Sequence, residues 1–190
     1  MLNNIAALMG GAAAAVATDY ESIATVTLGS SAAQANFTSI ATTYSHLQLR
    51  VSYMPTNGTN GTYAQIYVGN GSADTGANYA RHQLVGNGSS ASAGAAASTN
   101  YIFQGPAYSS NSNSNPCVMI IDLLDYANTN KYKTARILAG NDSNGAGSVD
   151  FDSGLWMNTS AINNISVRAF SMGSASNFGQ YSSFALYGIK

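Results

Sequence analysis

Charged side chains are scarce in this sequence, where Asp, Glu, Lys and Arg together make up only 8% of the residues. That share is about a third of the usual one in soluble proteins, so neutral Ser, Thr, Asn and Gly must keep the surface hydrated. The seven basic residues are scattered, and the formal net charge is −1. Because nucleic-acid binding depends on clustered Lys and Arg that neutralise phosphates, we expect no nucleic-acid partner.

Cysteine is limited to one residue, Cys117. A single cysteine excludes a disulfide within the chain, and the apolar residues at 118–121 predict that its thiol is buried. With 190 residues the chain has the usual size of one domain and is long enough to bury a core without disulfides or metal ions.

Titratable groups for catalysis are few, with one Glu, seven Asp and two His. Acid–base catalysis requires such groups to be paired, so His46 and His82 would have to converge with a carboxylate such as Asp74 or Asp19. The sequence contains no nucleophile elbow, no zinc-protease motif, no Cys-x-x-Cys and no phosphate-binding loop. We therefore expect a protein that is not an enzyme, with no catalytic residue and no cofactor.

Oxygen-rich side chains gather at residues 142–145 (DSNG), with Asp150 and Asp152 downstream. Calcium prefers carboxylate and amide oxygens that converge from a turn, but the spacing does not fit an EF-hand. A turn that hydrogen-bonds its own backbone is the alternative, and we favour it. We expect no metal ligand here, although the sequence leaves calcium binding near Asp142 open.

Short alternating runs of apolar and polar residues, separated by turn signals, follow one another from residue 19 onward. The clearest is 46–53, where Leu47, Leu49, Val51 and Tyr53 share one face. Eleven strands are expected, at 22–28, 34–40, 46–53, 63–68, 79–85, 100–103, 117–124, 133–139, 148–151, 164–170 and 182–187. The spacing predicts an all-β fold, namely an antiparallel β-sandwich of the jelly-roll-like type.

Asn-Gly dipeptides at 57–58, 60–61, 70–71, 87–88 and 144–145 predict tight turns, because they tolerate positive φ angles. Residues 89–98 and 108–115 are rich in small or polar side chains and predict long exposed loops, which would carry outward-facing binding. Residues 122–130 look helical at most as a short turn.

Residues 118–124 are apolar on both faces as far as Asp122, which predicts a central strand covered by a layer on each side. Trp156 is either part of the core or an exposed platform for a ligand, and we favour the core. If exposed, Trp156 and the tyrosines would stack on sugar rings.

The first 19 residues form a separate, apolar segment. A signal peptide requires Lys or Arg before its apolar part, and this segment has neither. The segment is also too short and too rich in Gly and Ala to span a membrane. We expect residues 1–19 to be an anchoring arm that docks on a neighbouring protein, ahead of a β-sandwich domain at 20–190. Its expected contact residues are Met1, Leu2, Ile5, Leu8, Met9 and Val16.

Six blocks carry a resemblance to a known family: YESIATVT (20–27), FTSI (37–40), YSHLQLR (44–50), LLDYANTNKYKT (123–134), SGLWMNTSAI (153–162) and QYSSFALYGIK (180–190). Together they resemble small virion structural or tail-fibre-like proteins from phages of aquatic bacteria and cyanobacteria. The resemblance extends from about residue 20 to the end of the chain. It implies a β-rich component of a bacteriophage virion, and the family supplies no catalytic residues to transfer.

Two virion roles follow from this resemblance. A tail fibre needs a shaft, and the sequence contains neither coiled-coil heptads nor a collagen-like repeat. A capsid decoration or cement protein needs only a compact domain and a docking arm, so we expect a homotrimer on the outer surface of the particle, bound to the major capsid protein or another virion protein. The alternative is a fibre module that binds a host surface glycan.

Overall fold

The computed structural model describes residues 19–56, 61–106, 115–172 and 176–190. In these residues the chain forms twelve strands and no helix. The strands are β1 (Tyr20–Thr27), β2 (Gln34–Phe37), β3 (His46–Tyr53), β4 (Tyr63–Gly69), β5 (Tyr79–Gly86), β6 (Ala91–Thr99), β7 (Phe103–Gln104), β8 (Cys117–Leu124), β9 (Lys133–Asp142), β10 (Gly147–Trp156), β11 (Asn164–Phe170) and β12 (Ser183–Ile189).

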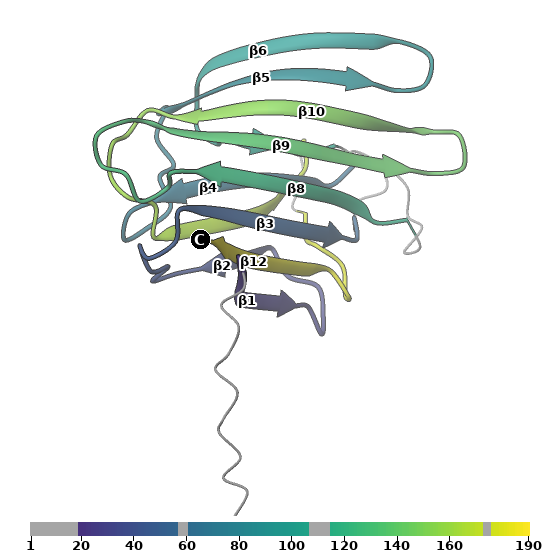
Figure 1. Cartoon of the computed structure of the whole chain (residues 1–190). Coiled ribbons are helices and arrows are strands. Elements are labelled where there is room, and N and C mark those ends of the chain that lie inside the picture. Colours follow the sequence, from purple (N-terminus) through teal and green to yellow (C-terminus); the bar gives the residue numbers. More distant parts are fainter. Residues whose placement is uncertain (1–18, 57–60, 107–114, 173–175) are drawn as a thin grey trace, which may run out of the picture.

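The strands form two antiparallel sheets of unequal size. The larger sheet has the order β1-β12-β3-β8-β9-β10-β5-β6, and the smaller sheet has the order β2-β11-β4-β7. Figure 1 shows the smaller sheet behind one side of the larger one, while β5 and β6 lie at the far edge. The expected all-β, antiparallel β-sandwich is confirmed.

The core lies between the two sheets and follows the alternation seen in the sequence. Leu47, Leu49, Val51 and Tyr53 of β3 are all buried, as predicted. Neighbouring β8 buries its odd-numbered residues in the same layer, beginning with Cys117. The smaller sheet contributes apolar side chains from β2, β4 and β11, among them Phe37, Ile66, Val68, Ile165 and Val167.

Large aromatic side chains fill the ends of this core. The Phe178 ring lies 5.4 Å from that of Tyr53 and 5.1 Å from that of Phe184, between centroids. Trp156, at the end of β10, is only 1% exposed. The favoured prediction that Trp156 belongs to the core is therefore confirmed.

Two of the predicted Asn-Gly turns close hairpins of the larger sheet. Between β9 and β10, Asn144 has φ +54° and Gly145 has φ +99°, a pair of positive angles that such two-residue turns require. Between β5 and β6, Asn87 accepts hydrogen bonds from the backbone of Ser89 and Ser90. Residues 57–60 lie outside the described residues.

One sequence-based expectation about loops was wrong. Residues 89–98 do not form a long loop, because 91–99 are the edge strand β6, paired with β5 from Gly86↔Ala91 onward. Residues 91–99 are a strand because their backbone pairs with β5, which the side-chain pattern alone did not reveal. Residues 122–130 begin with the end of β8, which continues to Leu124, and a short turn follows at 125–127, as expected.

Candidate functional site

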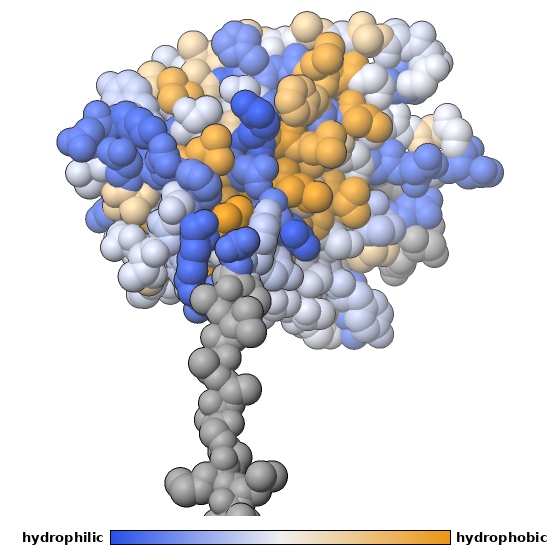
Figure 2. All heavy atoms as spheres, viewed as in Figure 1, coloured by the Kyte–Doolittle hydropathy of each residue, from blue (hydrophilic) through white to orange (hydrophobic). Residues whose placement is uncertain are grey.

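Six apolar side chains lie exposed together on the outer face of the larger sheet, the side turned away from the smaller sheet. Leu84, Val118, Ile120, Leu138, Val149 and Phe151 are each between 43% and 61% exposed. We call these six residues the outer apolar face. Figure 2 shows them as a hydrophobic cluster over β8, β9, β10 and β5.

Strand register brings these residues together. Ile120 of β8 stands opposite Leu138 of β9, Leu138 opposite Phe151 of β10, and Phe151 opposite Leu84 of β5. In the adjacent row, Val118 and Val149 lie on either side of Gly140. Directly opposed side chains on antiparallel strands have Cβ atoms about 5 Å apart, so the row forms one continuous apolar ridge.

A polar border adjoins the outer apolar face on the side of β3. Gln48 donates a hydrogen bond of 2.8 Å to Asp122, and Asp122 stands opposite Arg136. The guanidinium of Arg50 lies 4.9 Å from the ring centroid of Tyr187 and 2.7 Å, through Nε, from the Gln48 amide oxygen. The border therefore holds charges of both signs in fixed positions.

The outer apolar face corrects the prediction that 118–124 is covered on both sides. Met119, Ile121 and Leu123 are buried between the sheets, as a central strand requires. Val118 and Ile120, which point the other way, are exposed because no described part of the chain packs on that side. Residues 118–121 are therefore apolar on both faces of the strand, but the described chain covers only the inner face.

Two carboxylates are buried on the opposite, inner face of β10. Asp150 stands opposite Ala139 and Asp152 opposite Ile137, both of which are core residues. Asp150 is 8% exposed and Asp152 is 3% exposed. Among the described residues, neither Asp150 Oδ1 nor Asp152 Oδ2 has a hydrogen-bond partner.

This environment raises the pKa of both carboxyls. Burial raises the pKa of Asp152 to about 7, the charge of Asp150 adds to the rise, and Arg81 opposes it. Burial also raises the pKa of Asp150, against a hydrogen bond from Ser148. Both carboxyls therefore lose their protons at higher pH than a free aspartic acid does.

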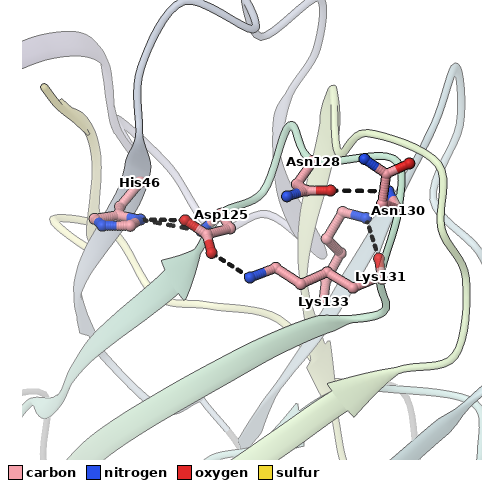
Figure 3. A network of polar contacts seen from close by, with 6 residues as sticks. All are labelled: His46, Asp125, Asn128, Asn130, Lys131 and Lys133. Atoms are coloured by element: carbon pink, nitrogen blue, oxygen red, sulfur yellow. Dashed lines mark hydrogen bonds and ion pairs between the residues drawn. The ribbon is translucent and has the colours of Figure 1, made fainter.

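A second polar network lies where β8 ends (Figure 3). The backbone N–H of Asp125 donates to His46 Nδ1 at 3.0 Å, and Lys131 donates to Asp125 Oδ2. The ion pair with Lys131 lowers the pKa of Asp125. Lys133 Nζ donates to the backbone oxygens of Lys131 and Thr159. Burial lowers the pKa of Lys133.

This second network organises the turn between β8 and β9. Asp125 has a positive φ of +49° and Asn128 Oδ1 accepts from the N–H of Asn130, both features of a tight, self-bonded turn. Its polar side chains bond within the turn and to adjacent segments of the chain at His46 and Thr159. The arrangement fixes the turn between β8 and β9.

The two histidines do not converge. His46 lies in β3 and His82 in β5, and three strands separate these in the larger sheet. Four inter-strand spacings of about 4.8 Å place them roughly 19 Å apart across the sheet. Asp74 instead accepts a hydrogen bond of 2.8 Å from the indole of Trp156. The metal or base site considered for His46, His82 and Asp74 is thus not formed.

The acidic residues around 142–152 separate in space as well. Asp142 Oδ1 accepts the N–H of Asn144 at 2.9 Å in the exposed hairpin turn, which is the self-bonded turn that we favoured. Asp150 and Asp152 point inward from β10. Over the described ranges, no group of three or more His, Cys, Asp or Glu is arranged to hold a metal ion.

Several predicted contact residues cannot be placed. Met1, Leu2, Ile5, Leu8, Met9 and Val16 of the expected arm lie outside the described residues, as does 108–114 of the second expected loop. Sequence reasoning missed the outer apolar face as a surface. Its signal was present in the two-sided apolar run at 118–124 and in the alternation of Val149 and Phe151 with two aspartates.

Comparison of the chain with protein-family models, with curated proteins and with solved structures gives no match. In the part of the chain that the structure describes, no helix is long and apolar enough to cross a membrane.

Proposed function

We propose that this protein is a structural, non-catalytic component of a bacteriophage virion, a decoration or cement protein on the outer surface of the capsid. The observation that carries the proposal is the outer apolar face. Monomeric soluble proteins rarely leave a contiguous apolar patch of this kind uncovered, and such patches mark surfaces that bind other proteins. A building block of a larger assembly needs such a surface.

The rest of the molecule supports this role. A low-charge surface suits dense packing against neighbouring subunits, because few charges must be desolvated when subunits meet. In this proposal residues 1–19 dock on the major capsid protein or another virion protein and tie neighbouring subunits together. Each added contact stabilises the assembled shell by mass action.

Two finer features belong to the same proposal. The β-sandwich is jelly-roll-like, as in many virion proteins with two packed antiparallel sheets. The protein acts as a homotrimer, because closed cyclic symmetry is usual for such assemblies.

Immunogold electron microscopy of purified particles tests the proposal, with an antibody raised against residues 20–190. We expect label over the whole head. Label confined to the tail would replace decoration by a fibre role, and particles without label would remove the virion role altogether.

A second candidate function, a carbohydrate-binding module of a fibre, is favoured by Tyr181. Its side chain is 76% exposed, and its backbone has a positive φ of +70°, which is uncommon for a residue of this size. It borders a surface pocket lined also by Gly29, Ser30, Ser31, Thr56, Gly179 and Gln180. An exposed ring beside hydroxyl and amide groups suits the stacking and hydrogen bonding of a sugar.

A glycan array with the purified chain tests this second function. Selective binding that Tyr181→Ala abolishes would favour a receptor-binding module. Absence of binding would leave decoration as the proposal.

A further inference from the structure

We propose that the outer apolar face is covered by a second copy of this chain. The inference deepens the proposed function, on which it rests, because it names the partner of the surface that carries that function.

The first argument is the two-sided pattern of β8. Buried strands with layers on both faces are apolar throughout, whereas strands with one face in water alternate apolar with polar residues. In β8, Val118 and Ile120 on the outer face are as apolar as Met119 and Ile121 on the inner face. As far as Asp122, the strand has the composition of one covered on both faces, so a layer over its outer face would come from outside the described chain.

The second argument is size. Eight strands at about 4.8 Å spacing make the outer face of the larger sheet roughly 34 Å wide, and eight residues of about 3.3 Å make it roughly 26 Å long. The resulting area of about 900 Å² matches the roughly 800 Å² that each partner contributes to a standard protein interface. One protein surface of ordinary size would therefore cover the outer side of the larger sheet, including the four strands, β8, β9, β10 and β5, that carry the outer apolar face.

The third argument concerns the chemistry of the occupant. Five of the six residues are aliphatic and the sixth is Phe151, which suits neither sugar hydroxyls nor a nucleic acid. Membrane-binding surfaces surround their apolar residues with Lys and Arg, whereas this face is bordered by one aspartate and two arginines. An apolar centre with a polar rim is the anatomy of a protein–protein interface.

The fourth argument favours a copy over a different protein. The border carries Asp122 together with Arg50 and Arg136, so a symmetry-related copy can place its Asp122 beside an arginine of the first copy. The net charge of −1 produces little repulsion between copies. An apolar ridge on a sheet also complements itself, since sheets stack face to face about 10 Å apart in β-sandwiches.

Light scattering and sedimentation velocity on the purified full chain test the inference. We expect a mass of two or three times 19.6 kDa for the unaltered protein. Leu138→Lys places a charge at the middle of the ridge and should reduce the mass to that of one chain. Phe151→Ser, which removes the largest side chain of the face, should do the same if Leu138→Lys does not fold.

Met172→Lys is the matched control, because Met172 is 64% exposed and lies outside the larger sheet. It should leave the assembled mass unchanged, and far-ultraviolet circular dichroism should show the same fold in all variants. An oligomer that survives both Leu138→Lys and Phe151→Ser would overturn the inference. So would a single-chain mass for the unaltered protein, which would assign the face to residues 1–18 or to a different protein.

These outcomes are separate from the fate of the proposed function. Labelled phage heads together with a monomeric chain would refute the second copy and keep the virion role. A chain that assembles through this face but labels no particle would do the reverse.

Discussion

Asp150 and Asp152 occupy inward-facing positions of β10, where a strand with one buried face normally has apolar side chains. They alternate with exposed Val149 and Phe151, so β10 presents its apolar residues to the outside and its charged ones to the core side. Placing two carboxyls in the interior disfavours their ionised forms, and proximity disfavours ionising both. The protonation of this pair is therefore coupled to folding.

Asp152 makes the stability of the domain depend on pH. Its pKa is 3.8 in an unfolded chain and about 7 in the folded one, so the folded state binds more protons between these values. Stability is then greatest at acid pH and falls as pH rises through this window, by up to about 4 kcal/mol, since one pKa unit corresponds to about 1.4 kcal/mol. Urea unfolding near pH 5 and near pH 8 should reveal roughly 3 kcal/mol of this loss, because the remainder occurs below pH 5.

The isosteric change Asp152→Asn should remove most of this slope and raise stability near pH 8. Asp142→Asn is the control, because Asp142 lies in the exposed β9–β10 turn. Equal slopes in the unaltered protein and in Asp152→Asn would show that Asp152 ionises as freely in the fold as in water.

Gly154 of β10 lies close against Ile102, in the segment before β7. A Cβ atom added there would lie 2.6 Å from the backbone oxygen of Ile102. Because backbone cannot move aside as a flexible side chain does, Gly154→Ala should cost about 1–3 kcal/mol in the free energy of unfolding. Thermal or urea denaturation measures the loss.

Gly86 in neighbouring β5 serves as the control for this substitution. No atom lies within 4 Å of a Cβ built there. Gly86→Ala should therefore be neutral or slightly stabilising, by a few tenths to about 1 kcal/mol. A Gly154→Ala protein as stable as Gly86→Ala would mean that the two segments separate easily.

Among the elements, β3 and β6 mark the limits of prediction from sequence. The alternation at 46–53 identified both the strand and its buried face, because each apolar side chain there gains by burial. In β6, Ala, Ser and Gly supply no alternation, and only its pairing with β5 makes it a strand. A pairing between chain segments leaves no mark in the local composition.

The candidate site shows the same division. The two-sided run at 118–124 was visible, but it predicted burial, since a single sequence does not say which layer covers a strand. The outer apolar face requires β8, β9, β10 and β5 to be neighbours. Strand β5 precedes β8 in the sequence but lies beyond β10 in the sheet. The strand order was therefore needed to place Leu84 beside Phe151 in the ridge.

For the whole molecule, the proposed function assigns the contact with the shell to residues 1–19 and leaves folding to the β-sandwich domain. Deleting residues 2–18 should abolish incorporation into particles, because that segment is the proposed contact with the shell. The remaining domain should keep its fold and its melting temperature within a few degrees, since the described core contains only residues from 28 to 186. Quantitative blotting of purified particles and differential scanning calorimetry measure the two effects. Normal incorporation would place the contact elsewhere.

The larger sheet is held firmly in its middle and weakly at its β6 edge. Strands β3 and β8 have neighbours on both edges and bury one face, whereas β6 is held only by β5 and buries none of its side chains fully. Amide hydrogen exchange should therefore be fastest in β6, slower in β5 and slowest in β3 and β8. A uniform rate across the sheet would show that the sandwich opens in one step. With the expected gradient and in the proposed role, the domains on a heated or sheared particle would lose strands one after another from β6 before a whole domain unfolded.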